Sequence, residues 1–366
     1  MTPLVYILLL LLLAISPWLL LPSLRNSQTS STLLCLFHLS KQGSSQKPSE
    51  IVSLRVYPIK SCRGFEITHS KLRMTGLDLD RRWMIVDAET HTFLTIRQNA
   101  NMTRILTGLS EDGESLLLST ADNKEKQVAI PAHPTAEWLA RNTTLASDVE
   151  IWDTVTDGYV YNASVGVNQL FSAFLKCNVV LVYKGPTPRI LKGNGDPKLL
   201  GRVQNTNFPD VHPVLIASQA SIDELNSRLT GTGHEAITIE RFRPNIIIRG
   251  DKEKPWVEDW WKTVKISAPA SSSTSGAVGQ GKSSVTFDIV ARCGRCQVPN
   301  VDPVTADKHR TQPWDTLMKY RRVDEGLKYK PCFGMLGAPR GEGEVRVGMK
   351  FEVLEETKAH RYIKGF

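Results

Sequence analysis

Apolar and polar residues alternate over several short stretches of this chain, a pattern typical of β-strands with one buried face. Valine and leucine fall at every second position of IVSLRVYPIK (51–60). The two apolar runs of RWMIVDAETHTFLTIR (82–97) predict a hairpin that turns at DAET, and LTGLSEDGESLLLS (106–119) predicts a second hairpin. We therefore expect the first half of the chain to consist mainly of short strands, as in a β-barrel or β-sandwich.

Helical spacing of apolar residues occurs in few places. VNQLFSAFLKC (167–177) brings its leucine and phenylalanine residues onto one face. SIDELNSRL (221–229) begins with a capping box formed by Ser221 and Glu224, and QPWDTLMKYRRV (312–323) has a proline near its first turn, as helix starts permit. Strand patterns return in the last third of the chain. The sequence thus predicts a mainly β fold with a few helices, of the α+β class.

The N-terminal segment differs from the rest of the chain. Residues 4–21 carry no charge, and a helix of this length spans roughly 27 Å, close to the thickness of a bilayer's hydrocarbon core. We therefore expect a transmembrane helix at 1–22, with a cleaved signal peptide as the alternative. Basic residues follow and no acid precedes Glu50, so the positive-inside bias predicts that the remainder of the chain faces the cytosol.

Further boundaries follow from changes in composition. Residues 23–49 are rich in serine, glutamine and lysine and are expected to form a linker. APASSSTSGAVGQGKSS (268–284) has almost no bulky residues, so we expect a disordered insertion between two strands. The length permits two domains, which we place at 50–185 and 186–361.

Charge and cysteine content narrow the classes of function. The formal net charge is +8, from 45 basic and 37 acidic residues, and the excess forms no basic run, so nucleic acid is not an expected partner. A modest excess of basic residues of this kind fits a basic pocket for an anionic cofactor better. Six cysteines, widely spaced except for one pair, indicate a reducing compartment in which close cysteines serve metals or catalysis.

The close pair is Cys293 and Cys296, within ARCGRCQVPNVDP (291–303). A structural zinc site needs four ligands, and no second pair is present. A redox dithiol would open a helix, whereas prolines follow this pair. Two interpretations of the pair remain. Either the cysteines are two unrelated core residues, or one of them is a single metal thiolate near Arg292 and Arg295. A thiolate beside cationic groups suits a soft or high-valent transition metal.

Polar motifs stand where strands are expected to end. YPIKSC carries Lys60 and Ser61, LDRRWM carries Arg81, and FRPN carries Arg243 and Asn245. A guanidinium group binds phosphate through two parallel hydrogen bonds, and a lysine adds a point charge. Surface charge explains any one of these motifs alone, whereas together with a thiolate they fit a pocket for an anionic, metal-bearing cofactor.

The order of the motifs resembles the MOSC superfamily of molybdenum-cofactor proteins, and within it the mitochondrial amidoxime-reducing components. The motifs are VYPIKSC, LDRRWM, LTIRQ, FPDVHPVLIASQAS, FRPNIII and RCGRCQVPNVDP, and the resemblance extends from Ile51 to Glu355. It implies a MOSC-type N-terminal β-barrel domain over 50–185 and a MOSC β-barrel domain over 186–361. It also implies a molybdenum cofactor between them, with molybdenum bound by two pterin sulfurs and one protein cysteine.

The resemblance further implies which residues form the site. Cys296, directly before QVPNVDP, matches the metal ligand and is a catalytic residue, and Cys293 becomes a bystander. Asn245 is the second catalytic candidate, as a hydrogen-bond donor. Val211 and His212 depart from the small hydroxyl residues of the family, and valine cannot bond phosphate or pterin. The implied cofactor-binding residues are Lys60, Ser61, Arg81, Arg97, Asp210, Ser218, Arg243, Asn245 and Cys296.

The implied activity is two-electron reduction of small N-hydroxylated compounds such as amidoximes, hydroxylamines and N-oxides. Electrons are expected from cytochrome b5 and its NADH-dependent reductase, since no ferredoxin-like tail follows Phe366. A membrane anchor would hold these partners on one surface and raise their effective concentration. The mitochondrial outer membrane is favoured over the endoplasmic reticulum.

A non-enzymatic carrier is the alternative function. In that case a MOSC module would handle cofactor or sulfur for other proteins, with a persulfide on Cys296. A membrane-tethered binding protein without a metal is a further alternative. The resemblance also admits pyridoxal phosphate as a ligand, although no lysine-aldimine transferase domain precedes the barrel, which argues against a full molybdenum-cofactor sulfurase.

Overall fold

The computed structural model describes residues 46–269 and 284–365 of the chain. The predicted transmembrane helix at 1–22 lies outside these ranges, as do the predicted linker up to residue 45 and most of the predicted insertion at 268–284. Within the two ranges that are described, no helix is both long and apolar enough to cross a bilayer.

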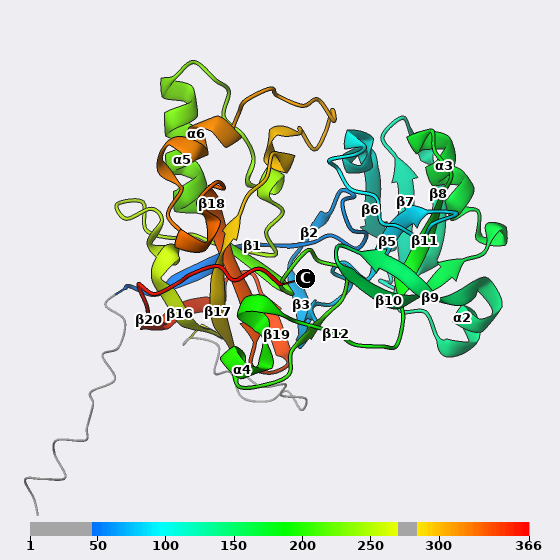
Figure 1. Ribbon diagram of the computed structural model, residues 1–366, viewed down its shortest axis with the longest axis horizontal. Helices are drawn as coiled ribbons and strands as arrows, with labels where there is room; N and C mark the ends of the chain where they lie inside the picture. The colour runs from blue at the N-terminus through cyan, green and yellow to red at the C-terminus, as the bar shows by residue number, and fades with distance from the viewer. Residues whose placement is uncertain (1–45, 270–283, 366) are drawn as a thin grey trace, which may run out of the picture. The chain divides into compact units, whose positions relative to one another are not determined.

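A closed barrel dominates the C-terminal half of the described chain (Figure 1). Its sheet has the strand order β15-β14-β18-β17-β16-β20-β1-β2, and an additional pairing of β15 with β1 closes all of it except β2. Neighbouring strands are antiparallel, apart from the parallel pair β14 and β15. The strands are β1 (Ser49–Val56), β2 (Phe65–Ile67), β14 (Val214–Ser218), β15 (Ile246–Ile248), β16 (Trp261–Ser267), β17 (Ser284–Gly294), β18 (Cys332–Pro339) and β20 (Lys350–Glu356).

Alternating burial accounts for the barrel strands. Along β17, Val285, Phe287 and Ile289 are buried and the residues between them are partly exposed, as the two-residue period of a strand requires. These side chains share one apolar core with Trp261 and Phe351. The strands predicted in this half are therefore confirmed except at the start of the stretch 236–250, where Ile239–Phe242 form a 3-10 helix and only Ile246–Ile248 form a strand. β16 pairs with β17 on either side of the predicted insertion.

β1 belongs to this barrel, although the predicted boundary at 50–185 assigns it to the first domain. Its hydrogen bonds join it to β15 and β20, and Ile51 and Leu54 are buried in the same core as Ile246. The strand is thus first in sequence but belongs to the second barrel in space. Because the YPIKSC motif follows β1 directly, its residues leave the barrel toward the other half of the protein.

The short strands that the sequence predicted for a barrel or sandwich in the N-terminal half are arranged as two antiparallel sheets around one core. One sheet has the order β5-β11-β10-β9 and the other β6-β7-β8. Trp83, Leu118 and Leu181, from both sheets, pack together with Phe171. The strands are β5 (Trp83–Asp87), β6 (Ile105–Leu109), β7 (Ser115–Thr120), β8 (Asn123–Pro131), β9 (Thr143–Ile151), β10 (Thr154–Tyr161) and β11 (Val179–Lys184).

One of the two predicted hairpins is confirmed. β6 and β7 pair across the predicted turn, with Leu109 opposite Leu116. In the segment 82–97, only the first run forms a strand, β5. The second run contributes two bridges, one from Phe93 to Val86 across the predicted turn and one from Thr92 to Glu150. β5 also pairs with β11, at the end of the four-stranded sheet.

The predicted helices are present as α3 (Val167–Leu175), α5 (Gln219–Gly231) and α6 (Trp314–Tyr320); α2 (Ala136–Asn142) and α4 (Pro197–Leu200) were not predicted. The predicted capping box at the start of α5 is wrong. Ser221 Oγ accepts a hydrogen bond from the backbone N–H of Trp256, and Glu224 accepts one from the Trp256 indole N–H. Both side chains are therefore used in tertiary contacts instead of capping the helix.

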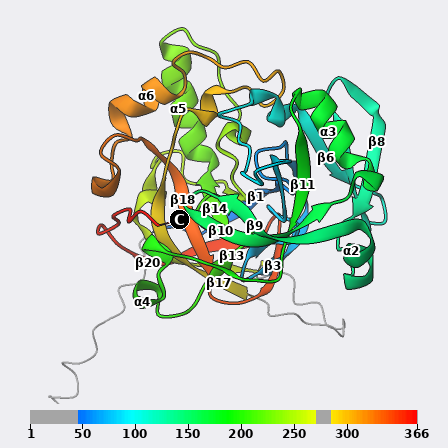
Figure 2. The same cartoon turned by 45° about the vertical axis from the view of Figure 1, so that its right-hand side comes forward.

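Small sheets and loops complete the described chain around the barrel ends. β3 (His69–Arg73) pairs with β19 (Gly343–Arg346) and β4 (Gly76–Leu77), and β12 (Arg189–Ile190) pairs with β13 (Asn205–Thr206). Figure 2 shows β18, β14 and β1 in this order across the barrel. The loops at the ends of the barrel strands carry most of the residues that the sequence predicted for the site.

Candidate active site

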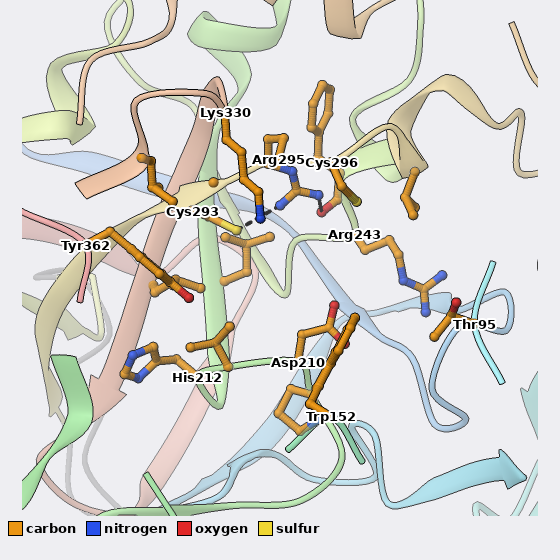
Figure 3. Close-up of a pocket in the computed structure, with 18 of the residues that line it drawn as sticks. Thr95, Trp152, Asp210, His212, Arg243, Cys293, Arg295, Cys296, Lys330 and Tyr362 are labelled. Atoms are coloured by element: carbon orange, nitrogen blue, oxygen red, sulfur yellow. Dashed lines mark hydrogen bonds between the residues drawn. The ribbon is translucent and has the colours of Figure 1, made fainter. Parts of the chain in front are cut away.

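A cavity of about 620 Å³ lies where loops from both halves meet, and Figure 3 shows residues that line it. Its lining draws on segments that are far apart in the sequence, from the YPIKSC motif to the C-terminal strands. Ser218 is the one predicted residue that the cavity does not include. The predicted residues that line it are Lys60, Ser61, Arg81, Arg97, Asp210, Arg243, Asn245 and Cys296.

Ser218 is buried, and the structure does not bring it to the cavity, contrary to the prediction. Leu215, on the same strand, does line the cavity. Side chains alternate between the two faces of a strand, so Ser218 lies on the opposite face, where Val214 and Ile216 pack into the barrel core.

Both close cysteines line the cavity, and neither forms a disulfide. Arg97 Nη2 donates a hydrogen bond to Cys296 Sγ over 3.5 Å, and Arg295 Nη1 donates one to Cys293 Sγ over 3.0 Å. Each sulfur is half-buried and in contact with a guanidinium group. Cys293 is therefore not a remote bystander, and the alternative of two unrelated core cysteines does not describe this pair.

Asp210 connects several side chains of the cavity. Its carboxylate accepts hydrogen bonds from Lys60 Nζ and, over 3.2 Å, from Trp152 Nε1. Arg97 Nη2 lies 3.9 Å from its other oxygen. Burial lowers the pKa of Lys60 to about 8, against the opposing effect of the Asp210 charge. The Lys60 ammonium group therefore remains mostly protonated at neutral pH.

Two guanidinium groups lie over one aromatic ring. Those of Arg81 and Arg243 are 4.5 and 4.3 Å from the centroid of the buried Tyr57 ring. Asp80 accepts hydrogen bonds from Arg81 Nη1 over 2.8 and 2.6 Å and from the Tyr57 backbone N–H over 2.9 Å. Among the described residues, Arg243 Nη2 is buried without a hydrogen-bond partner. Such an unpaired donor is unfavourable, and an anion bound in the cavity would supply the missing acceptor.

Three of the predicted residues share an uncommon backbone conformation. The φ angles of Ser61, Arg81 and Arg243 are 69°, 48° and 57°. Residues with a Cβ adopt this left-handed region rarely because of steric crowding. Such conformations gather at functional sites, where the surrounding structure maintains them. The geometry thus marks the same residues that the motifs marked.

Asn245, the second predicted catalytic residue, lines the cavity and is hydrogen-bonded within the protein. Its Nδ2 donates to the backbone carbonyl of Arg55 over 3.3 Å, and its Oδ1 accepts from the backbone N–H of Leu215 over 3.1 Å. The protein itself therefore engages this buried amide, which holds the strand ends together at the edge of the cavity.

Several lining residues were not identified from the sequence. Trp152, Lys330 and Tyr362 line the cavity and stand in segments without a motif. Only long-range contacts bring them to the site, so no local signal could have identified them. Val211 and His212, whose contacts were in doubt, both line the cavity, and burial lowers the pKa of His212 to about 3.

The lining suits an anionic group that carries a soft metal. Among the lining residues that the structure describes, Asp210 is the only acid. The unpaired Arg243 donor and the half-buried Cys296 thiol fit the phosphate and the metal of a molybdenum cofactor. In the described ranges, no three or more His, Cys, Asp or Glu side chains gather as a metal site. The basic lining residues are Lys60, Arg81, Arg97, Arg243, Arg295, Lys328, Lys330 and Lys364.

Comparison with known proteins gives relatives of two kinds. Mitochondrial amidoxime reducing component 2 of Macaca fascicularis is 28% identical over 314 residues, which cover 83% of each chain. Mitochondrial amidoxime-reducing component 1 of Homo sapiens is 27% identical over 312 residues, 83% of this chain and 82% of that protein. Molybdenum cofactor sulfurase of Arabidopsis thaliana is 31% identical over 294 residues, 78% of this chain but only 32% of that protein.

Two family models match successive parts of the chain. The MOSC N-terminal beta barrel domain matches residues 49–178, and the MOSC domain matches residues 203–352. The cavity draws residues from both matched ranges, including Lys60 from the first and Cys296 from the second. The chain therefore belongs to the MOSC-domain proteins and resembles the amidoxime-reducing components over most of its length.

Proposed function

We propose that this protein is a molybdenum-cofactor-dependent reductase of N-hydroxylated compounds such as amidoximes, hydroxylamines and N-oxides. The observation that carries the proposal is the position of the Cys296 thiol in the same cavity as Arg81 and Arg243. A thiol for a metal and guanidinium groups for a phosphate are the protein groups that such a cofactor requires. Similarity to two amidoxime-reducing components favours reductase chemistry at this site.

Each residue has a distinct part in this proposal. The cofactor, when bound, would supply the two-electron chemistry. Cys296 would bind its metal, while Arg81 and Arg243 would bind its phosphate. Arg97 contacts the Cys296 sulfur and lies near Asp210, so it would hold the sulfur in position. Asp210 would in turn orient Arg97 and the Lys60 ammonium group through its two carboxylate oxygens.

The proposal includes a source of electrons and a location. Cytochrome b5 and its NADH-dependent reductase would supply the electrons, and the apolar segment at 4–21 would anchor the chain with its catalytic part on the cytosolic side. Anchoring donor and acceptor on one membrane raises their effective concentration. Two similar proteins are named as mitochondrial, which favours the mitochondrial outer membrane over the endoplasmic reticulum.

The test is benzamidoxime reduction by the purified full chain, loaded with cofactor and supplied with NADH, cytochrome b5 and its reductase. Cys296→Ser should lose the activity while remaining folded, because an oxygen ligand is harder than sulfur and binds a soft metal less well. Cys177→Ser is the matched control, since Cys177 is an exposed cysteine that does not line the cavity. Reduction by Cys296→Ser at the wild-type rate would refute the proposal.

A sulfur carrier is the second candidate, and the pairing of two cysteines in one cavity favours it. The similarity to a molybdenum cofactor sulfurase points the same way. Intact-protein mass spectrometry separates the candidates, because a carrier would show additional sulfur on Cys296 after incubation with a sulfur donor. A stable content of molybdenum without added sulfur supports the reductase instead.

A further inference from the structure

The cavity has two ends, and its cysteines lie between them. Figure 3 shows Tyr362 and His212 toward one end and Arg243 and Thr95 toward the other. The Arg243 end contains the residues that fit a phosphate. The opposite end contains side chains that the proposed cofactor site does not use.

We propose that this opposite end binds the body of the substrate and selects compounds that combine a flat apolar body with an anionic group. We call it the substrate wall and define it by the apolar residues Val211, Leu215, Leu336 and Tyr362 together with Lys330, which Figure 3 shows at the centre of the view near Cys293; all five line the cavity. The proposal rests on the proposed function, because it names a substrate class for the same site.

The apolar surface of the substrate wall is continuous. Leu215 and Leu336 are buried in one cluster, and Val211, Cys293 and Tyr362 pack against it as partly buried members. Their partial exposure toward the cavity leaves apolar area for a ligand to cover. An aromatic ring such as Tyr362 pairs well with a flat ligand in an offset or edge-to-face arrangement.

The position of Tyr362 is fixed by contacts of its own backbone segment. Its N–H donates to Asp324 Oδ1 over 2.8 Å, and the next N–H, of Ile363, donates to Asn194 Oδ1 over 2.7 Å. The carbonyl of His360 accepts from Arg292 Nη1 over 2.9 Å. Hydrogen bonds therefore fix the backbone on both sides of Tyr362, so the Tyr362 ring has a defined position in the cavity lining.

Lys330 stands beside Cys293 for a similar reason. The backbone N–H of Arg295 donates to the carbonyl of Pro331 over 2.8 Å, and Gly294 pairs with Cys332. The segment that carries Lys330 thus runs along the two cysteines. Figure 3 shows the Lys330 side chain directed toward the side of the cavity that holds Cys293.

The charge of Lys330 differs from those of Lys60 and Arg81 in having no ion-pair partner among the described residues. Lys60 is paired with Asp210, and Arg81 with Asp80. Among the described residues, Lys330 has no carboxylate within ion-pair distance. An anionic group on the substrate would give this ammonium its partner while the apolar body covers the substrate wall.

The experiment compares three substrates that differ at one position: benzamidoxime, 4-carboxybenzamidoxime and its neutral isostere 4-carbamoylbenzamidoxime. Dissociation constants are measured calorimetrically on the cofactor-loaded full chain without an electron donor, so that binding is read apart from turnover. The variant is Lys330→Gln. Lys319→Gln, an exposed lysine of α6 outside the cavity lining, is the matched control.

We expect Lys330→Gln to weaken binding of 4-carboxybenzamidoxime about two- to fivefold, the range for a solvent-exposed ion pair. Both neutral compounds should bind as to the wild type, and the difference should shrink as salt is raised. Tyr362→Ala should weaken all three compounds alike, because each has the same apolar body. Lys319→Gln should change none of them.

Three outcomes would overturn the inference: an equal effect of Lys330→Gln on charged and neutral compounds, no effect on any, or a loss of bound molybdenum from that variant. The last would assign Lys330 to the cofactor. Failure of the proposed function looks different, since binding would retain its charge preference while NADH-dependent reduction of benzamidoxime was absent.

Discussion

Arg81 Nη2 donates a hydrogen bond to the backbone carbonyl oxygen of Arg243 over 3.1 Å. The two residues come from separate segments of the chain, and both have left-handed backbone conformations. Both guanidinium groups also lie over the Tyr57 ring. The pair is therefore positioned by the protein before any ligand binds, and such preorganisation reduces the entropic cost of binding.

Arg81→Ala should weaken cofactor binding by about 10- to 100-fold, because a hydrogen bond to a charged group contributes roughly 1.5–3 kcal/mol. The molybdenum content per chain after gel filtration measures this loss. Arg82→Ala is the matched control, since Arg82 lies over Tyr183 and does not line the cavity. Equal molybdenum contents in Arg81→Ala and the wild type would contradict the role given to Arg81.

Tyr57 offers a sharper comparison, because its ring and its hydroxyl group have different surroundings. The ring underlies both guanidinium groups, whereas the buried hydroxyl has no hydrogen-bond partner among the described residues. Tyr57→Phe should therefore keep the molybdenum content and stabilise the fold by about 0.5–1 kcal/mol in urea unfolding. Tyr57→Leu should lose cofactor, since it removes two cation–π contacts. Equal molybdenum contents in the two variants would show that the ring does not hold the arginines.

The sequence was sufficient to predict site residues that directly follow a strand. Lys60 and Cys296 follow segments in which alternation already marks a strand, so a motif just beyond the alternation predicts a residue at the barrel's edge. The order of the motifs along the chain, which resembles that of a known family, then predicts that these residues belong to one site. For Ser61, Arg81 and Arg243, the fold adds a left-handed backbone that no pattern of side chains revealed.

What the sequence could not supply depends on long-range contacts. Ser218 was assigned to the site by the resemblance of its segment to the family, but the face of β14 that lines the cavity is determined by packing of the strand against the core. The segments that carry Lys330 and Tyr362 are held at the cavity by long-range hydrogen bonds, from the Arg295 N–H to the Pro331 carbonyl and from the Tyr362 N–H to Asp324. Ser221 matched a local capping pattern but bonds the Trp256 backbone instead. In each case a tertiary contact determined the position of the side chain, whether a local pattern was misleading, as at Ser221, or absent, as at Lys330 and Tyr362.

A buried ion pair away from the cavity should determine much of the stability. Arg321 donates to both oxygens of Asp259 over 2.8 Å, and both side chains are buried. Asp259→Asn should destabilise the fold by about 3–5 kcal/mol, because it leaves a buried guanidinium without its counter-charge. Glu344→Gln, which breaks an exposed pair with Arg346, should cost less than about 1 kcal/mol. Similar urea midpoints for the two variants would show that the buried pair is unimportant.

Glu258 should make stability depend on pH near neutrality. Burial raises the pKa of this carboxyl group from its ordinary 4.5 to about 7, and the charge of Asp259 adds to the effect. A carboxyl group with a higher pKa in the folded state binds its proton more tightly when the protein is folded. The stability that this proton contributes is therefore fully present below about pH 4.5 and is lost as the pH rises through about 7. This change in the pKa of Glu258 corresponds to about 3 kcal/mol in the free energy of unfolding. Glu258→Gln should therefore match the wild type at pH 4.5 and exceed its stability at pH 8, as urea unfolding at several pH values would measure. Glu253→Gln, at an exposed position, should follow the wild-type profile, and a Glu258→Gln profile parallel to that of the wild type would show that the carboxyl group does not titrate in this range.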